Sequence, residues 1–197
     1  MMNTTKLFLT LAGFILTLSL NAQITGNPDI QKRLDAFIEV ANAQKYSEMC
    51  DLMYPKLFTH IPKQELVDMA SVDNKGLTQK LTNRRITSFS TPFEEGNERF
   101  VRITYTTDII VDITEDGLYD SEKAIYGMLD LFKSTYGESS VRYNADEKRF
   151  TIIANKAMMA IQQDGGEWYL IEINTNQMEL MKALFLEAVL DALVRVE

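Results

Sequence analysis

The sequence predicts a mixed fold of the α+β class, with a curved antiparallel sheet wrapped around N-terminal helices. Three observations lead to this prediction. Apolar residues near the start of the chain recur every three or four positions, which is typical of amphipathic helices. From residue 81 their period changes to two, which is typical of strands with one buried face. Short turns join consecutive strands, and such turns favour antiparallel pairing.

The composition is that of an ordinary globular domain. Of the 197 residues, 46% are hydrophobic and 24% are charged. These values exclude a disordered chain, a collagen-like repeat and a multi-span membrane protein. The net charge of −8 argues against nucleic acid or anionic lipid as the main partner, since both bind cationic faces. The single Cys and single His exclude an internal disulfide and leave little for a His-rich metal site.

Residues 1–22 have the features of a secretory signal peptide. Lys6 precedes an apolar run from Leu7 to Leu20, and Ala22 supplies a small residue at the predicted cleavage site. A membrane anchor is the alternative, but a span takes about 20 apolar residues. We therefore expect a single domain over residues 23–197, exported to the periplasm or the medium, with no stable membrane span after cleavage. Cys50 would then lack a partner in an oxidising compartment and should be buried.

Three helices are predicted before the sheet. Asn27 and Pro28 supply the N-cap and first-turn proline of a helix over 28–43. A second helix over 46–54 stops at Pro55, and a third begins at Pro62 and ends before Gly76.

The predicted strands follow from the two-residue period. A strand over 81–89 turns back through 95–97 into a strand over 101–113, whose odd positions are almost all apolar. That strand is too long to stay flat in a small domain, so we expect a bend or a bulge. A second hairpin is predicted from strands over 141–143 and 149–162, and a last strand over 167–173.

Two helices lie outside this strand pattern. An inserted helix over 121–136 carries an apolar stripe and stops at Gly137, and a C-terminal helix is predicted over 177–196. A long bent sheet wrapped about the first helix would form a cone with an open mouth, which is a natural pocket.

Two segments resemble the nuclear-transport-factor-2-like superfamily, also called the cystatin-like cone fold. The stretch Phe37 to Leu57 is similar to its long and short opening helices, with the pattern Ala43-x-x-Tyr46, and 166–170 (GEWYL) is similar to its closing strand. The resemblance implies the cone and its pocket. It leaves the function open, because relatives include isomerases, dehydratases, binding domains and association domains.

Two residues are candidates for acid–base catalysis. His60 is the only histidine and has a side chain that titrates near neutrality, although it also fits a loop or helix cap. Asp108 lies on the polar face of the 101–113 strand, where a desolvated carboxylate could abstract a proton. The same face carries Arg102, Thr104 and Thr106, which also fits a solvated sheet surface.

A larger set of residues is predicted to line a pocket for an apolar ligand. Their spacing also fits ordinary core positions, so both interpretations stand. The set is Tyr46, Met49, Tyr54, Tyr105, Met158 and Trp168.

No cofactor and no metal site are predicted. The acidic segment 112–123 is similar to a calcium-binding loop, but Lys123 stands where the loop needs a bidentate carboxylate.

The C-terminal helix has more apolar surface than one buried stripe requires. Leu180, Leu184, Leu190 and Val194 lie outside that stripe, so the helix either packs on two sides or offers a surface to a second subunit or a protein partner. The predicted function is an exported, non-catalytic domain that binds a small apolar ligand or a protein partner. The alternative is a cofactor-free enzyme, similar to an isomerase or dehydratase, in which Asp108 or His60 transfers a proton.

Overall fold

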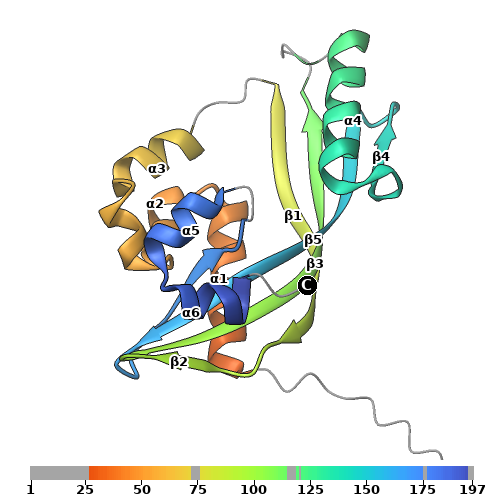
Figure 1. Ribbon diagram of the computed structural model, residues 1–197. Helices are drawn as coiled ribbons and strands as arrows, with labels where there is room; N and C mark the ends of the chain where they lie inside the picture. Colours follow the sequence, from red (N-terminus) through yellow and green to blue (C-terminus); the bar gives the residue numbers. More distant parts are fainter. Residues whose placement is uncertain (1–26, 72–75, 115–118, 120, 175–176, 195–197) are drawn as a thin grey trace, which may run out of the picture.

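The computed structural model describes residues 27–71, 76–114, 119, 121–174 and 177–194, and within them it has the α+β class predicted (Figure 1). The predicted leader at 1–22 lies outside the described residues. The α-helices are α1 Pro28–Asn42, α2 Tyr46–Asp51, α3 Lys63–Ala70, α4 Glu122–Tyr136, α5 Met178–Leu184 and α6 Glu187–Val189. The strands are β1 Leu77–Phe89, β2 Phe93–Glu95, β3 Glu98–Ile113, β4 Val141–Asn144, β5 Arg149–Gln163 and β6 Trp168–Glu172. Shorter helical turns are η1 Pro55–Thr59, η2 Glu138–Ser140 and η4 Leu190–Val194.

The six strands form one antiparallel sheet in the order β1-β3-β5-β4, with β2 paired to β3 and β6 paired to β5. The central pair, β3 and β5, keeps one register from Glu98 opposite Gln163 to Asp112 opposite Arg149. The described strands do not close into a barrel. The predicted antiparallel pairing is therefore confirmed, whereas the sheet is open. Among the described residues, no helix has the length and apolar character needed to cross a membrane.

The expected bulges are present, but in β1 and not in the long strand itself. The register of β1 against β3 shifts between Thr82 and Arg85 and again between Ile86 and Ser88. Asn83, inside the first shift, has a positive φ of 50°, a conformation that asparagine tolerates better than most residues. At each shift β1 has one residue more than the facing part of β3. The two strands therefore bend together, as the long strands in Figure 1 do.

One face of the sheet, which we call the inner face, carries the odd-numbered side chains of β3. All of them from Val101 to Ile113 are buried, which confirms the predicted alternation. Helix α1 covers one end of this face and α4 covers the other. The α1 cluster has the buried residues Ile30, Leu34, Val101, Ile103, Tyr105, Met158, Ala160, Trp168 and Leu170. The α4 cluster has the buried residues Ile109, Val111, Ile113, Met128, Val141, Phe150, Ile152 and Ala154.

The opposite, outer face packs against the C-terminal segments. The prediction of one continuous helix there is wrong, because Phe185 and Leu186 adopt extended conformations between α5 and α6. The break lets the ring of Phe185 stack on Tyr54, with centroids 5.8 Å apart, and meet the edge of Phe100 at 6.1 Å. Aromatic packing therefore overrides the local helical pattern.

The surplus apolar residues of this segment are used inside the chain. Leu184, Leu190 and Val194 are buried in the outer-face core, and Leu180 packs against it. These residues therefore pack within the chain, in one core with the rest of the segment. A contact between this segment and a second subunit or a protein partner stays a prediction.

Capping side chains and a glycine mark the ends of the two long helices, α1 and α4. The Asn27 side chain accepts a hydrogen bond from the Asp29 amide at 2.9 Å at the start of α1. Ser121 accepts one from the Ala124 amide at 3.2 Å at the start of α4, and Gly137 with φ 94° ends that helix. Cys50 is buried, as expected for a thiol without a partner.

Candidate functional site

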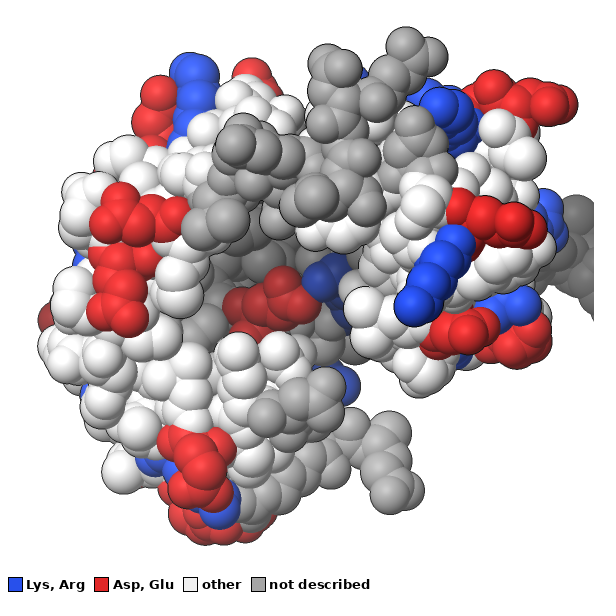
Figure 2. Space-filling view, turned by 90° about the horizontal axis from the view of Figure 1, so that it is seen from above, with Lys and Arg blue, Asp and Glu red and all other residues white. Residues whose placement is uncertain are grey.

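A cleft lies over the inner face, between the lobe formed by α1, α2 and α3 and the lobe that carries α4. Seen from above, the surface is hollowed between these lobes (Figure 2). The cavity has a volume of about 650 Å³. Its volume suits a small-molecule site.

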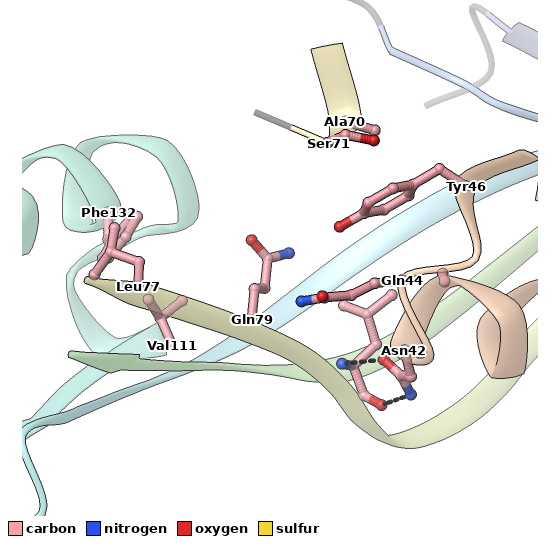
Figure 3. A pocket seen from close by; sticks show the side chains of 11 residues that line it. Asn42, Gln44, Tyr46, Ala70, Ser71, Leu77, Gln79, Val111 and Phe132 are labelled. Atoms are coloured by element: carbon pink, nitrogen blue, oxygen red, sulfur yellow. Dashed lines mark hydrogen bonds between the residues drawn. The ribbon is translucent and has the colours of Figure 1, made fainter. Parts of the chain in front are cut away.

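Three neutral polar side chains point into the cleft from two elements (Figure 3). Gln44 and Tyr46 come from the link between α1 and α2 and the start of α2, and Gln79 comes from β1. Within the described part of the chain, none of these three side chains has a hydrogen-bond partner. Their amide and hydroxyl groups therefore remain available to a bound molecule.

The backbone holds Gln44 in an unusual conformation. Its φ is 57°, in the left-handed region that glycine and asparagine occupy more readily. The Gln44 amide donates to the Ala41 carbonyl at 3.0 Å, which closes the turn after α1. Strained backbone often occurs where a side chain must be aimed at a ligand, and here the turn aims Gln44 into the cleft.

Asn42 fixes this wall of the cleft to the edge of the sheet. Its Nδ2 donates to the Leu81 carbonyl at 2.8 Å, and its Oδ1 accepts from the Leu81 amide at 2.9 Å. The side chain thus replaces the neighbouring strand that β1 lacks on this side. The two bonds keep α1 and β1 at a set separation, and the cleft lies above them (Figure 3).

The far wall of the cleft is apolar. It consists of Leu77, Val111 and Phe132, which reach the cavity from β1, β3 and α4. Phe132 meets Phe150 edge to face, with ring centroids 5.2 Å apart, so its position is set by the α4 cluster. The cleft therefore has a polar side and an apolar side.

The inner face of the sheet is polar between the two clusters. On β3 it has Thr107, whose hydroxyl donates to the Thr82 carbonyl at 2.9 Å. On β5 the alternation places Lys156 between Ala154 and Met158, and Lys156 pairs with Glu172 of β6 at 2.6 Å. Figure 2 shows acidic and basic side chains together at the bottom of the hollow. The ion pair of Lys156 and Glu172 carries no net charge.

Tyr105 lies beside this ion pair, directly opposite Lys156 in the β3–β5 register. Burial is the largest cause that raises the pKa of Tyr105, and the nearby Glu172 carboxylate raises it further. Tyr105 therefore stays protonated and neutral over the physiological range.

This arrangement suits binding of an uncharged molecule. Among the described residues that line the cavity, there is no Asp, Glu, Lys, Arg or His. The lining offers hydrogen-bond donors and acceptors on one side and apolar surface on the other. The charges of Lys156 and Glu172 already compensate each other, so a charged ligand would bring an unpaired charge into the cleft, and burying an unpaired charge is expensive.

The six residues predicted to bind a ligand do not lie together in one site. Tyr46 lines the cleft. Tyr105, Met158 and Trp168 are brought together, but as buried members of the α1 cluster. Trp168 also borders a separate hollow of about 400 Å³ beside α1. Tyr54 is buried against the outer face.

Met49, the sixth of that set, is half-buried in α2 and lines none of the hollows named here.

The two candidate acid–base residues lie away from the cleft lining. His60 is exposed at the end of η1, where its amide donates to the Leu57 carbonyl at 3.0 Å. Asp108 lies on the outer face and accepts a hydrogen bond from Asn83 Nδ2 at 2.7 Å. The structure does not bring these two residues and Tyr46 into one site. No group of three or more potential metal ligands occurs among the described residues.

A second polar constellation lies near the outer face. The Tyr54 hydroxyl donates to Glu98 Oε1 at 2.6 Å, and Gln163 Nε2 donates to the same oxygen at 2.7 Å. Burial, followed by the bond to Glu98, raises the pKa of Tyr54. Glu98 borders a hollow of about 280 Å³ together with Phe100 and Phe185. These bonds tie the start of β3 to the segment after α2.

Gln44 and Gln79 were not predicted as site residues. For Gln79 a signal was available, because Leu77, Gln79 and Leu81 continue the two-residue period toward the N-terminus, and the predicted strand began too late. For Gln44 we find no sequence signal, because its aim depends on the turn after α1.

No protein-family model matches this chain, and a search of curated proteins finds no similar sequence.

Proposed function

We propose that this chain is an exported, non-catalytic binding domain whose cleft holds a small uncharged ligand. The ligand would have hydrogen-bonding groups at one end and an apolar part at the other. The leader-like segment at 1–22 supports export. The segments similar to the nuclear-transport-factor-2-like superfamily, and the position of α1 and α4 on one face of the sheet, support a cone-like fold with a pocket.

The observation that carries the proposal is the lining of the cleft. Gln44, Tyr46 and Gln79 present unsatisfied neutral groups opposite the apolar side chains of Leu77 and Phe132. Replacement of water by an amphipathic molecule is favourable at both surfaces. The apolar part of the ligand is buried, and the polar groups exchange hydrogen-bond partners without losing bonds. This refines the apolar ligand expected from the sequence.

The same geometry favours binding over proton transfer at the two predicted residues. A general base must come within about 3 Å of the proton that it removes. His60 and Asp108 lie outside the described lining of the cleft. Replacing both by Ala should therefore leave ligand binding unchanged, and loss of a measured turnover in that variant would support the enzymatic alternative instead.

Native mass spectrometry of the purified protein tests for a bound ligand directly. We expect an adduct of a neutral small molecule that is lost in the variant Tyr46→Ala/Gln79→Ala. The matched control is Ile153→Ala, an exposed apolar residue on the outer face. An adduct that survives the double variant, or one that carries a net charge, would contradict the proposal.

A fluorescent probe gives an independent test. An uncharged naphthyl ketone dye should bind with a blue-shifted, saturable emission. Gln79→Trp should abolish that signal by filling the cleft, since a strand residue whose side chain points into the cavity can become larger without disturbing the core. Unchanged binding in Gln79→Trp would show that the dye occupies another place.

A further inference from the structure

The outward side of α4 carries large apolar side chains that nothing in the described chain covers. Tyr126 is 57% exposed and Leu131 is 60% exposed. The inward residues of the same helix, including Met128 and Phe132, pack in the α4 cluster. The outward apolar residues therefore add nothing to this core, and such exposed surface is typical of an interaction site.

Gly127 lies in the middle of this outward side, next to Tyr126. A glycine inside a helix costs about 1 kcal/mol relative to alanine. A Cβ added at Gly127 would meet no atom within 4 Å, so packing within the chain does not require a glycine there. A glycine on an open helix surface does, however, let another backbone or a flat ring approach closely.

Two charges flank the glycine and the tyrosine. Lys123 and Asp130 are exposed, and neither has an ion-pair partner among the described residues. They lie seven positions apart, so they lie on the same side of the helix as Gly127. When two copies of α4 pack antiparallel with the midpoint between 126 and 127, each Lys123 faces Asp130 of the other copy. The same register places each Tyr126 ring against Gly127 of the other copy.

We propose that α4 is the self-association surface of this protein, and that its occupant is α4 of a second copy in an antiparallel, two-fold arrangement. One register satisfies both charges and covers the tyrosine and the glycine at once, which a two-fold interface requires. The proposed contact does not involve the inward side of α4, which supplies Phe132 to the cleft. The inference therefore does not depend on the proposed ligand.

The size of the contact sets the expected strength. A helix of 15 residues is roughly 22 Å long, and one helix pair buries less than the ~800 Å² per partner of a standard stable interface. We therefore expect a reversible dimer that forms as the concentration rises, and not a permanent one.

Sedimentation velocity of the purified protein, from roughly 1 µM to 1 mM, measures this equilibrium. We expect a shift from monomer to dimer across that range. Lys123→Asp and Asp130→Lys should each weaken dimerisation at least about tenfold, because each places like charges opposite each other twice. The double variant Lys123→Asp/Asp130→Lys should restore it, since the pairs re-form with reversed sign.

Gly127→Ala separates folding from association. It should raise the thermal stability of the monomer through helix propensity and at the same time weaken the dimer by holding the tyrosine ring away. A chain that stays monomeric at roughly 1 mM overturns the proposal in favour of a partner with another sequence. A dimer that the single charge variants leave unchanged, or that the double variant fails to restore, overturns the proposed register and surface.

Discussion

The two ends of the inner face have the same kind of sheet beneath them but differ in the helix above. At one end α1 is enclosed, and its inward residues Ile30 and Leu34 are 0% exposed. Its polar residues also bind neighbours, as Asn42 does at β1. At the other end Met128 is the one buried residue of α4, and the outward side of the helix is open.

Strand alternation alone therefore does not set how firmly a helix is held. β3 supplies buried side chains to both clusters with the same period. What differs is the kind of element around the helix, since α1 contacts a second α-helix, α2, as well as β1 and β6, whereas α4 contacts β4, β5 and the short turn η2. The cleft lies where the two clusters end, and Thr107 separates them along β3.

The largest expected effect comes from breaking the enclosed end. Leu34→Ala should lower the free energy of unfolding by about 3 kcal/mol, because a fully enclosed site cannot collapse around the lost side chain. Urea denaturation followed by the fluorescence of Trp168, the single tryptophan in the chain, measures it. Met69→Ala, at an exposed residue, is the control and should change stability by less than about 0.5 kcal/mol. Equal effects of the two substitutions would refute the packing described here.

A smaller and more local effect is expected at the open end. Met128→Ala should cost about 2 kcal/mol, because the site lies at the border of its cluster and can relax. Hydrogen exchange should show lost protection in α4 and β4, with α1 still protected. If α1 loses protection to the same degree, the two ends unfold as one unit and the comparison between them fails.

The smallest effect concerns a hydrogen bond near the outer face, away from both ends compared above. Tyr54→Phe should cost about 1 kcal/mol at neutral pH, since it removes the bond to Glu98. The folded-state pKa of Tyr54 is raised, so its contribution is complete below a pH of about 10 and is lost as the pH rises above that value. The variant should therefore lose less stability than the parent as the pH rises above roughly 10.

The matched control for that measurement is Tyr105→Phe, because burial also raises the pKa of Tyr105. It should reduce the alkaline loss in the same direction. A Tyr54→Phe variant that keeps the full alkaline loss would show that the Tyr54 hydroxyl ionises equally in the folded and unfolded chains.

Much of the fold could be predicted because it depends on short-range patterns. The alternation in β3, the apolar stripe of α4 and the cap at Asn27 were all predicted correctly. The interruption at Phe185 could not be predicted, because the helical pattern continues through it and only Tyr54 and Phe100 reveal why the chain breaks.

The candidate site was predicted less well than the fold. Tyr46 was expected to contact a ligand and does line the cleft, but Tyr105, Met158 and Trp168 are mainly core residues. A residue type and a spacing indicate burial, and they do not distinguish a buried ring that faces a cavity from one that faces other side chains.

Most of the helices and strands, and the buried face of β3, followed from the amino-acid pattern alone, because periodicity and caps act over a few residues. The position of the cleft, and the side chains that enter it, depend on how these elements pack together. Gln44 and Gln79 lie far apart in the chain, yet both side chains enter the same cleft because Asn42 binds the edge of β1. Such a meeting depends on long-range contacts, which no local pattern encodes.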